Sequence, residues 1–484
     1  MKQIAVPLAL SFLALVVGAF GLGAQPLWND EAFSFFVAYK DVEHTLAFMR
    51  QDTQPPFYYL VLTGCLRFGH DPWVLRSLSV AAIVLAVPLL YDAGRRLLDA
   101  PTAVLGTLLF LLNANVLIWE QRARPYALQA GLVALAFWGF TRIWTSRPRP
   151  PEIAWLAWIL GGALALITQY PAGFFLLGAH VAMACRLLPH PRENAGAIVR
   201  WTLAQLAMFL LWGPWIPAFF VQFGAHLTPE QMVHNRNFLI GREDFIAGLR
   251  GLLSIPTLWR AQWPFVVAYA GLACLGAVAL WRRGVAWPIL GTCAVPLAVC
   301  IAGFAAVHPV LGYVTLNFVW LLLPYSLLIA AGITALPRKA AIAAGIVLLA
   351  GNIMGIRNVY TSHSVPLDQV ARAVGVQMAP GDGMILSQTA ATRWATAYYL
   401  GPPYAGKLVG LDVADMPAEG WPIVSVEQAN ALSRLWLILP DGEEPVLDPN
   451  SLTATFATAW TQRFAGVSVA RLDRRAETGK PVHE

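Results

Sequence analysis

Long apolar stretches alternate with short polar connections over roughly the first 360 residues of the chain. A helix needs roughly 20 apolar residues to cross the hydrocarbon core of a membrane, and each of these stretches is close to that length. The pattern therefore predicts about eleven membrane-spanning helices. They are expected near residues 5–23, 73–92, 101–119, 126–144, 153–169, 171–188, 201–221, 262–281, 285–305, 311–333 and 339–357.

Alternate connections between these stretches carry nearly all of the basic residues. By the positive-inside rule the basic connections face the cytoplasm, so the N-terminus is expected there. The loops 24–72, 119–125 and 222–261, and everything after about residue 358, are then expected outside. The basic residues in question are Arg95, Arg96, Arg142, Arg147, Arg149, Arg186, Arg192, Arg200, Arg282, Arg283, Arg338 and Lys339.

The pattern changes after Ser362 to short helices and strands that alternate, which favours a small α/β domain. Helices are predicted at Val365–Met378, Thr392–Leu400, Val424–Arg434 and Ser451–Phe464. Strands are predicted at Met384–Ser387, Leu435–Leu439 and Gly466–Ala470. The sequence thus predicts a membrane domain over 1–361 and an outer soluble domain over 362–484.

Composition agrees with this division. Only 12% of the 484 residues are charged, against roughly 25% in soluble domains. The net charge of +6 comes from short loops rather than from one patch, so it does not indicate nucleic-acid binding. None of the five cysteines shows metal-site spacing. The first apolar run is longer than the roughly 7–15 residues of a signal-peptide core, which favours an uncleaved first span.

The first outer loop holds two acidic positions of interest. Asp30 and Glu31 open a predicted helix over Asp30–Tyr39, and a second helix is expected over Glu43–Arg50. A carboxylate here can act as a general base on an acceptor hydroxyl. It can also hold a divalent cation, Mg²⁺ or Mn²⁺, and the structural alternative is a capped helix start, with Asn29 or Asp30 as the cap.

A second polar cluster, Asp52 with Gln54, precedes Pro55-Pro56 and the aromatic Tyr58. The alternative to a functional role is that Asp52 or Thr53 caps a proline-started helix whose aromatic residues lie at the interface.

The third cluster is an exception to the charge pattern, because Arg122 and Arg124 lie in a short outer turn beside Glu120 and Tyr126. An arginine fork suits phosphate oxygens. The alternative is a pair of snorkelling side chains.

These three clusters resemble the motifs of the GT-C membrane glycosyltransferases (family 39-like). The segments that carry the resemblance are Asp30-Glu31, then Asp52-Thr53-Gln54-Pro55-Pro56-Phe57-Tyr58-Tyr59, then Gln121-Arg122-Ala123-Arg124-Pro125-Tyr126. The branch they resemble most is that of the protein O-mannosyltransferases and the lipid A aminoarabinose transferases. Arg122 stands where many relatives have glutamate, and no arginine occurs in Gly312–Asn317, where relatives often have an Arg-Tyr pair.

The resemblance implies an inverting enzyme that uses a polyprenyl-phosphate-linked sugar on the outer face of a bacterial plasma membrane, with the C-terminal domain in the periplasm. It implies catalysis by Asp30, assisted by Glu31 and Asp52, with Asp30 and Glu31 as ligands if a metal is used. Arg124, Arg122 and Tyr126 are expected at the donor phosphate, and Gln54, Tyr58 and Glu120 around the substrate.

The acceptor would be a lipid, a glycan or a protein. The functional alternatives are a transporter or flippase for a lipid-linked or acidic solute, and a non-catalytic scaffold. Transporters usually place charges at mid-membrane in repeated halves with broken helices, whereas the charges here cluster at one rim and no internal repeat is evident.

Overall fold

The computed structural model confirms a largely helical membrane fold with a small C-terminal sheet. It describes residues 2–146, 149–226, 242–255, 262–307, 318–362, 365–379, 382–386, 394–396, 398–399, 432–441 and 454–475. The segment Gly312–Asn317, part of the helix predicted at Thr392–Leu400 and most of the helix predicted at Val424–Arg434 lie outside these residues.

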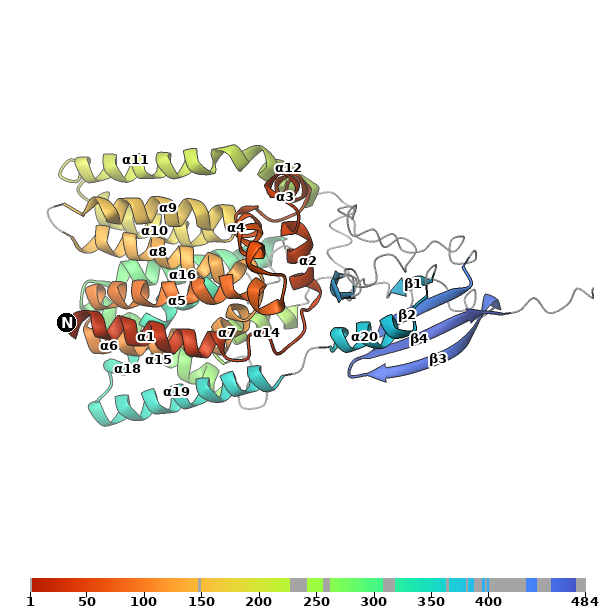
Figure 1. Cartoon of the computed structure of the whole chain (residues 1–484). Helices are drawn as coiled ribbons and strands as arrows, with labels where there is room; N and C mark the ends of the chain where they lie inside the picture. Colours follow the sequence, from red (N-terminus) through yellow and green to blue (C-terminus); the bar gives the residue numbers. More distant parts are fainter. Residues whose placement is uncertain are drawn as a thin grey trace, which may run out of the picture. The chain divides into compact units, whose positions relative to one another are not determined.

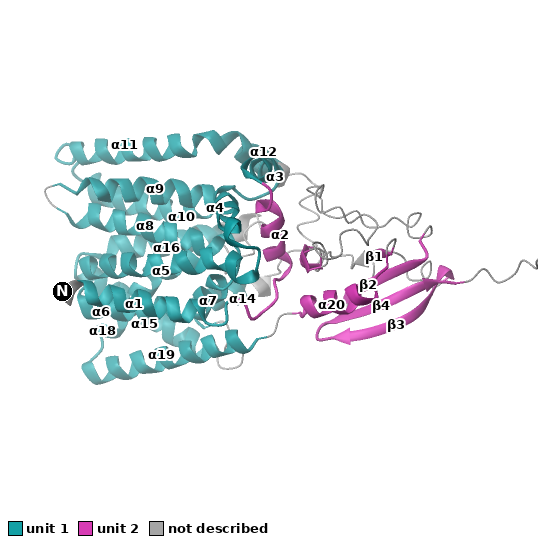
Figure 2. Ribbon diagram, in the orientation of Figure 1, with its two compact units in different colours: residues 1–22, 41–362 teal, residues 23–40, 363–484 magenta. Residues whose placement is uncertain are grey.

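The chain forms two compact units (Figure 2). Unit 1 comprises Met1–Leu22 and Asp41–Ser362, and unit 2 comprises Gly23–Lys40 and His363–Glu484. The segment that carries Asp30 and Glu31 therefore groups with the C-terminal residues. The division at 361/362 into two folding domains stays a prediction.

Unit 1 is a bundle of roughly parallel and antiparallel helices (Figure 1). Among the described residues, five helices are long and apolar enough to cross a membrane, and one bent pair would make a sixth span. Each of the eleven predicted spans contains an apolar helix in its described part. The helices are α1 (Lys2–Ala19), α5 (Pro72–Leu97), α6 (Ala100–Leu111), α7 (Ala114–Glu120), α8 (Pro125–Thr145), α9 (Glu152–Thr168), α10 (Ala172–Leu187), α11 (Ala195–Trp212), α12 (Ile216–His226), α14 (Arg242–Leu252), α15 (Gln262–Arg282), α16 (Ala286–Val307), α18 (Leu322–Thr334) and α19 (Arg338–Thr361).

Glycines let these helices approach closely. A Cβ added at Gly161 of α9 would lie 2.8 Å from the carbonyl oxygen of Leu132 on α8, and one at Gly139 of α8 would lie 2.6 Å from that of Ala154 on α9. Small residues play this part in membrane bundles, where van der Waals packing replaces the hydrophobic driving force. Tight packing of α8 with α9, and of α5 with α8, fixes the two turns that carry the polar clusters.

Two short helices lie in the loop before α5. They are α3 (Val42–Gln51), which confirms the second helix predicted in this loop, and α4 (Phe57–Cys65). The prediction that Asp52 or Thr53 caps α4 is wrong, because the residue before α4 is Pro56 and its end has no side-chain cap. Asp52 instead ends α3, where its N–H donates to the carbonyl of Phe48 (3.2 Å).

Unit 2 contains α2 (Asn29–Ala38), α20 (Leu367–Gln377) and a four-stranded sheet in the order β1-β2-β4-β3. The strands are β1 (Gly383–Leu386), β2 (Arg434–Pro440), β3 (Phe456–Phe464) and β4 (Val467–Arg474). Among these four described strands, β1 and β2 pair in parallel and the other two neighbouring pairs are antiparallel. Buried Leu435, Phe456 and Leu472 form the centre of a hydrophobic cluster on the sheet.

The helix predicted at Ser451–Phe464 is a strand over most of its length. Phe464 pairs with Val467, which leaves a two-residue loop containing Gly466. Gly466 has φ of +78°, a conformation that suits a hairpin turn and that glycine adopts at no steric cost. The hairpin pairing with β4 therefore decides the structure of this segment.

Candidate active site

The residues around Asp52 form a turn that presents polar groups at the end of unit 1 where α5 and α8 begin. The Oδ1 of Asp52 accepts a hydrogen bond from the backbone N–H of Gln54 (3.0 Å). This is an Asx-type turn, which forms because an Asp side chain readily accepts a hydrogen bond from the backbone two residues later. It explains the conformation of the chain from Asp52 to Gln54. The Oδ2 of Asp52 makes no hydrogen bond within the described part of the chain and remains available.

Gln54 is held from two sides. Its Oε1 accepts hydrogen bonds from the hydroxyl of Tyr59 on α4 (3.0 Å) and from the Nε2 of Gln169 (3.1 Å). Gln169 follows α9, and its carbonyl accepts from the Nε2 of Gln129 on α8 (3.2 Å). Three helices thus fix the amide of Gln54 and, through the turn, the carboxylate of Asp52.

Asp52 and Arg124 are the two predicted residues that the structure most clearly brings together. Arg124 is buried, with 5% of its surface exposed, at the residue before α8. Burial raises the pKa of Asp52 above its ordinary value, while the N–H groups of Thr53 and Gln54 and the charge of Arg124 act in the opposite direction. Asp52 forms no ion pair with any described residue. Asp52 therefore lies within reach of the charge of Arg124 and keeps one carboxylate oxygen that no described donor uses.

Arg122 and Tyr126 are held by aromatic packing. The Arg122 guanidinium lies 5.3 Å from the ring centre of Trp119, and that of Arg124 lies 5.8 Å from the ring of Tyr126. The two rings pack edge to face at 4.7 Å. The carbonyl of Arg122 also accepts a hydrogen bond from Ser79 of α5 (2.6 Å). The turn is therefore rigid, and both arginines have fixed stems.

Glu120 has contacts of a different kind. It is 1% exposed, and its Oε1 has no hydrogen-bond partner within the described residues. The carboxyl packs against Gly18 of α1 and lies close enough to Tyr360 of α19 to interact electrostatically. An ionisable group buried in a membrane protein is costly and is by default a functional candidate. The structure surrounds it with α1 and α19.

Tyr58 is fully buried and packs edge to face on Tyr59 at 5.2 Å. Its predicted role at the substrate stays a prediction, as do the roles of the other site residues.

In unit 2, Asp30 and Glu31 have distinct local roles at the start of α2. The Oε2 of Glu31 accepts a hydrogen bond from the backbone N–H of Trp28 (3.2 Å), so Glu31 caps the helix. Glu31 is 2% exposed, whereas Asp30 is half-buried. Asn29 caps a different segment, because its Oδ1 accepts from the N–H of Trp394 (2.7 Å). Of the two acids, Asp30 is the one whose side chain is more exposed to a substrate.

The rest of α2 is held by aromatic residues of the same unit. Trp394 packs on Phe33 at 5.4 Å and on Phe36 at 5.6 Å, and Tyr398 packs on Phe35 at 5.0 Å. The loop segment around Asp30 is therefore fixed by C-terminal residues far away in the sequence.

A divalent cation needs several oxygen ligands from different positions. Within the described residues, no three His, Cys, Asp or Glu side chains gather closely enough to hold a metal ion. Glu31 is also committed to its backbone cap. The use of a metal ion by Asp30 and Glu31 stays a prediction, and the mechanism proposed below uses none.

Two arginines were missed by the sequence reasoning. Arg76 of α5 is 4% exposed and donates to the carbonyl of Leu22 (2.9 Å). It lies one helical turn before Ser79, on the same face of α5, and Ser79 contacts the turn of Arg122. In the sequence, Arg76 could have been recognised as a charged residue one helical turn inside an apolar stretch.

Arg250 of α14 is the second. Its Nε is buried without a hydrogen-bond partner in the described residues, and its guanidinium lies 5.2 Å from the ring of Trp263. The next residue, Gly251, accepts a hydrogen bond from Asn115 of α7 (2.7 Å). No local pattern distinguishes Arg250 in the sequence.

Comparison with known proteins supports the motifs. Residues 53–217 match the family of dolichyl-phosphate-mannose-protein mannosyltransferases. This range includes Gln54, the tyrosines of α4 and the turn of Arg122 and Arg124. No curated protein shows a significant sequence match to the chain.

The fold is similar to that of three solved structures. ArnT from Cupriavidus metallidurans in the apo state superposes with a TM-score of 0.63 at 13% identity, over 97% of this chain and 98% of ArnT. The same ArnT bound to undecaprenyl phosphate gives 0.59 at 13% identity with the same coverage. An oligosaccharyltransferase from Archaeoglobus fulgidus gives 0.51 at 12% identity, over 90% of this chain and 68% of that one. These findings confirm the resemblance to the GT-C glycosyltransferases of the ArnT and protein mannosyltransferase kind.

Proposed function

Because the chain has the GT-C fold and matches a mannosyltransferase family across two of its three motifs, we propose that it is an inverting glycosyltransferase. It moves a hexose or pentose from a polyprenyl-phosphate donor to a hydroxyl of a lipid, glycan or protein. Transfer takes place on the outer face of the plasma membrane, with the N-terminus in the cytoplasm. ArnT has been solved with undecaprenyl phosphate, a ligand of the donor's chemical class.

The observation that carries this proposal is the closeness of the buried Arg124 to Asp52, whose Oδ2 accepts no hydrogen bond within the described residues. An arginine fork suits phosphate oxygens, and a lipid phosphate arrives at the depth of a span end. Arg124 begins α8 at such an end. Its fork binds the donor phosphate, and the available Oδ2 of Asp52 accepts a hydrogen bond from a sugar hydroxyl. Arg122 and Arg76 add positive charge at the same end of unit 1.

The reaction needs one base and one stabilised leaving group. The acceptor oxygen attacks the anomeric carbon, and the bond from this carbon to the phosphate oxygen breaks with its electron pair. Asp30 takes the hydroxyl proton, and polyprenyl phosphate leaves with the additional negative charge. Arg124 stabilises that charge. Glu31 contributes by holding Trp28 and thereby the start of α2.

Transfer of labelled sugar from polyprenyl-phosphate donors by purified protein tests this function, with envelope lipids and glycans as the acceptor pool. Asp30→Asn and Arg124→Ala are compared with Arg357→Ala, which removes an exposed arginine from the last turns of α19. We expect transfer by the wild type and by Arg357→Ala, and a loss of at least about 100-fold in Asp30→Asn. Wild-type rates in both site variants, in folded protein, would rule out this mechanism.

One observation favours a transporter as the second candidate. The span formed by α6 and α7 is bent by 56° at Leu112–Asn113, and the buried Glu120 ends its second half. Broken helices beside an ionisable residue are typical of transport sites. Movement of labelled polyprenyl-phosphate-sugar across vesicles, without sugar transfer to any acceptor, would favour this function.

A further inference from the structure

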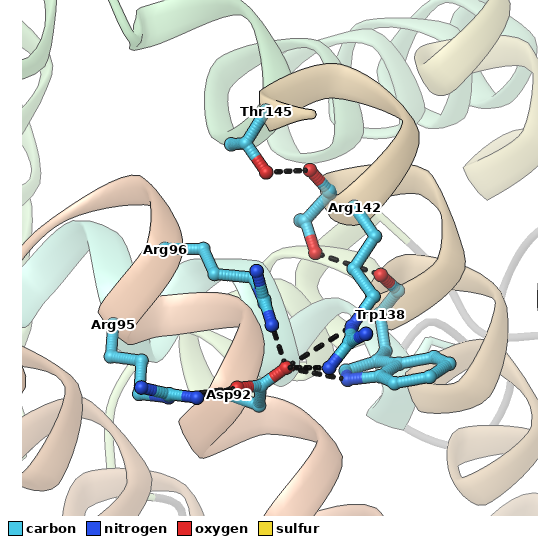
Figure 3. A network of polar contacts seen from close by, with 7 residues as sticks. Asp92, Arg95, Arg96, Trp138, Arg142 and Thr145 are labelled. Atoms are coloured by element: carbon cyan, nitrogen blue, oxygen red, sulfur yellow. Dashed lines mark hydrogen bonds and ion pairs between the residues drawn. The ribbon is translucent and has the colours of Figure 1, made fainter. Parts of the chain in front are cut away.

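At the opposite end of unit 1, where α5 and α8 finish, one carboxylate gathers three arginines (Figure 3). We call Asp92, Arg95, Arg96, Trp138 and Arg142 the Asp92 cluster. The Oδ1 of Asp92 accepts from the Nε of Arg95 (2.7 Å). Its Oδ2 accepts from the Nε of Arg96 (2.8 Å), the indole N–H of Trp138 (2.8 Å), and the Nη2 and Nε of Arg142 (3.1 and 3.3 Å).

The cluster carries an excess of positive charge. Three guanidinium groups face one carboxylate, which leaves a net charge of +2 from 3 positive and 1 negative side chains. No other described acid forms an ion pair with these arginines. The nearest acid in the sequence, Asp99, caps α6 and pairs with Arg283 instead (3.9 Å). Three cations held this close repel one another, so a second anion would stabilise them.

The cluster also has unused hydrogen-bond donors. A guanidinium has five N–H groups, and Arg96 uses only its Nε within the described part of the chain. Arg142 uses its Nε and Nη2, and its guanidinium stacks 4.2 Å from the ring of Trp138. The arginine side chains are 23–37% exposed, whereas Asp92 is 15% exposed. The arginines that hold unused donors are therefore more exposed than the carboxylate that they surround.

The position of the cluster indicates the kind of anion. Arg95 and Arg96 lie in the last turn of α5, and Arg142 lies in the last turn of α8. Both helices are long and apolar enough to cross a membrane. Trp144 at the end of α8 and Arg186 in the last turn of α10 form a second stacked pair, at 4.7 Å. Tryptophan and arginine at the end of a span mark the depth of the lipid headgroups.

We propose that the Asp92 cluster binds the phosphate of an anionic phospholipid headgroup in the leaflet at this end of the bundle. Basic pockets between membrane helices are suited to such headgroups. Asp92 holds the three guanidinium groups in place before the lipid binds, and the lipid phosphate accepts from the N–H groups of Arg95, Arg96 and Arg142 that Asp92 leaves unused. This inference does not depend on the proposed glycosyl transfer, because it concerns other residues at the other end of unit 1.

Native mass spectrometry of the detergent-purified protein tests the site with phosphatidylglycerol and with zwitterionic phosphatidylcholine as probes. The variants are Arg96→Gln and Arg95→Gln, and the control is Arg200→Gln, which removes an exposed arginine of α11 without touching the cluster. One arginine near the surface contributes roughly 1 kcal/mol to anionic-lipid binding. We therefore expect each cluster variant to retain roughly five-fold less phosphatidylglycerol, and the control to retain as much as the wild type.

A second experiment distinguishes binding of a lipid headgroup from binding of a soluble anion. Thermal unfolding is measured in phosphatidylcholine nanodiscs with added phosphatidylglycerol or with inorganic phosphate. We expect phosphatidylglycerol alone to raise the midpoint of the wild type, and the rise to disappear in Arg96→Gln. Equal lipid retention in all three variants, no preference of the wild type for phosphatidylglycerol, or an equal rise with inorganic phosphate would each overturn the proposal. Arg95→Gln decides the matter if Arg96→Gln does not fold.

Discussion

Gly18 of α1 lies directly against the carboxyl group of Glu120. A Cβ at position 18 would lie 2.6 Å from the Cδ of Glu120 and 3.2 Å from its Cγ, and it would overlap Oε1. The absence of a side chain on α1 thus makes the space for a buried acid at the end of α7. The next residue, Gln121, reinforces the contact by donating to the carbonyls of Phe20 (2.7 Å) and Gly18 (3.1 Å).

Gly18→Ala is therefore expected to destabilise unit 1 by about 2 kcal/mol, because overpacking of a tight contact typically costs this much. The measurement is the thermal midpoint of purified protein in detergent. Gly271→Ala is the matched control, since a Cβ at this position of α15 meets nothing within 4 Å.

A double-mutant cycle identifies the partner. Glu120→Ala removes the group that the added methyl meets, so Gly18→Ala should cost much less in that background. An equal cost with and without Glu120 would show that the contact with the carboxyl is not the cause.

Because the pKa of Asp52 is raised, we expect the protein to lose stability and to gain activity as pH rises. A carboxyl whose folded-state pKa is raised gives stability that is fully present below its ordinary value of 3.8 and is lost as pH rises through the raised pKa. Asp52→Asn removes this loss and keeps the acceptor for the N–H of Gln54. We expect the midpoint of Asp52→Asn to exceed that of the wild type by an amount that grows as pH rises above 3.8.

Asp52→Asn should also abolish the rise of sugar-transfer rate with pH. Sugar transfer that needs ionised Asp52 rises with pH through its raised pKa, and Asp52→Asn should be slower and flat over that range. A pH–rate profile measured beside the pH–stability profile checks both. A midpoint difference that shrinks as pH rises would contradict the sign.

The spans and polar clusters could be read from the sequence because each has a local cause. A run of about twenty apolar residues is long enough to span a bilayer. The basic residues in alternate connections predict the direction of each span. The strand β3 could not be read this way, because the segment Phe456–Phe464 takes its structure from pairing with β4 across Gly466. Likewise, the environments of Arg76 and Arg250 depend on distant residues, Leu22 and Trp263.

The local sequence also could not assign the two adjacent acids of the first loop. Either Asn29 or Asp30 fits a cap by residue type, yet the chain uses Glu31 for this purpose, and Asn29 caps the segment at Trp394. The contact of Asn29 spans more than 360 residues of sequence, so no local pattern could have indicated it.

This assignment predicts that the two acids respond differently to amide substitution. Glu31→Gln keeps an oxygen acceptor for the N–H of Trp28, so stability and sugar transfer should stay near wild type. Glu31→Ala loses the cap and should cost about 1 kcal/mol. Asp30→Asn should keep the midpoint and lose at least about 100-fold in rate. Equal rate losses in Asp30→Asn and Glu31→Gln, measured by labelled-sugar transfer, would assign chemistry to both.

We expect substitution by lysine to reduce sugar transfer more at Arg124 than at Arg122. Arg124 is buried beside Asp52 and is expected to bind the donor phosphate with its fork, which an ammonium group cannot reproduce. Charge-assisted hydrogen bonds contribute about 1.5–3 kcal/mol, so Arg124→Lys should weaken transfer roughly 10- to 100-fold. Arg122 is more exposed and stacks on Trp119, so Arg122→Lys should lose less. The comparison uses kcat/KM against donor concentration, at equal folded fraction. If Arg122→Lys were the more damaging change, the phosphate contact would belong to Arg122.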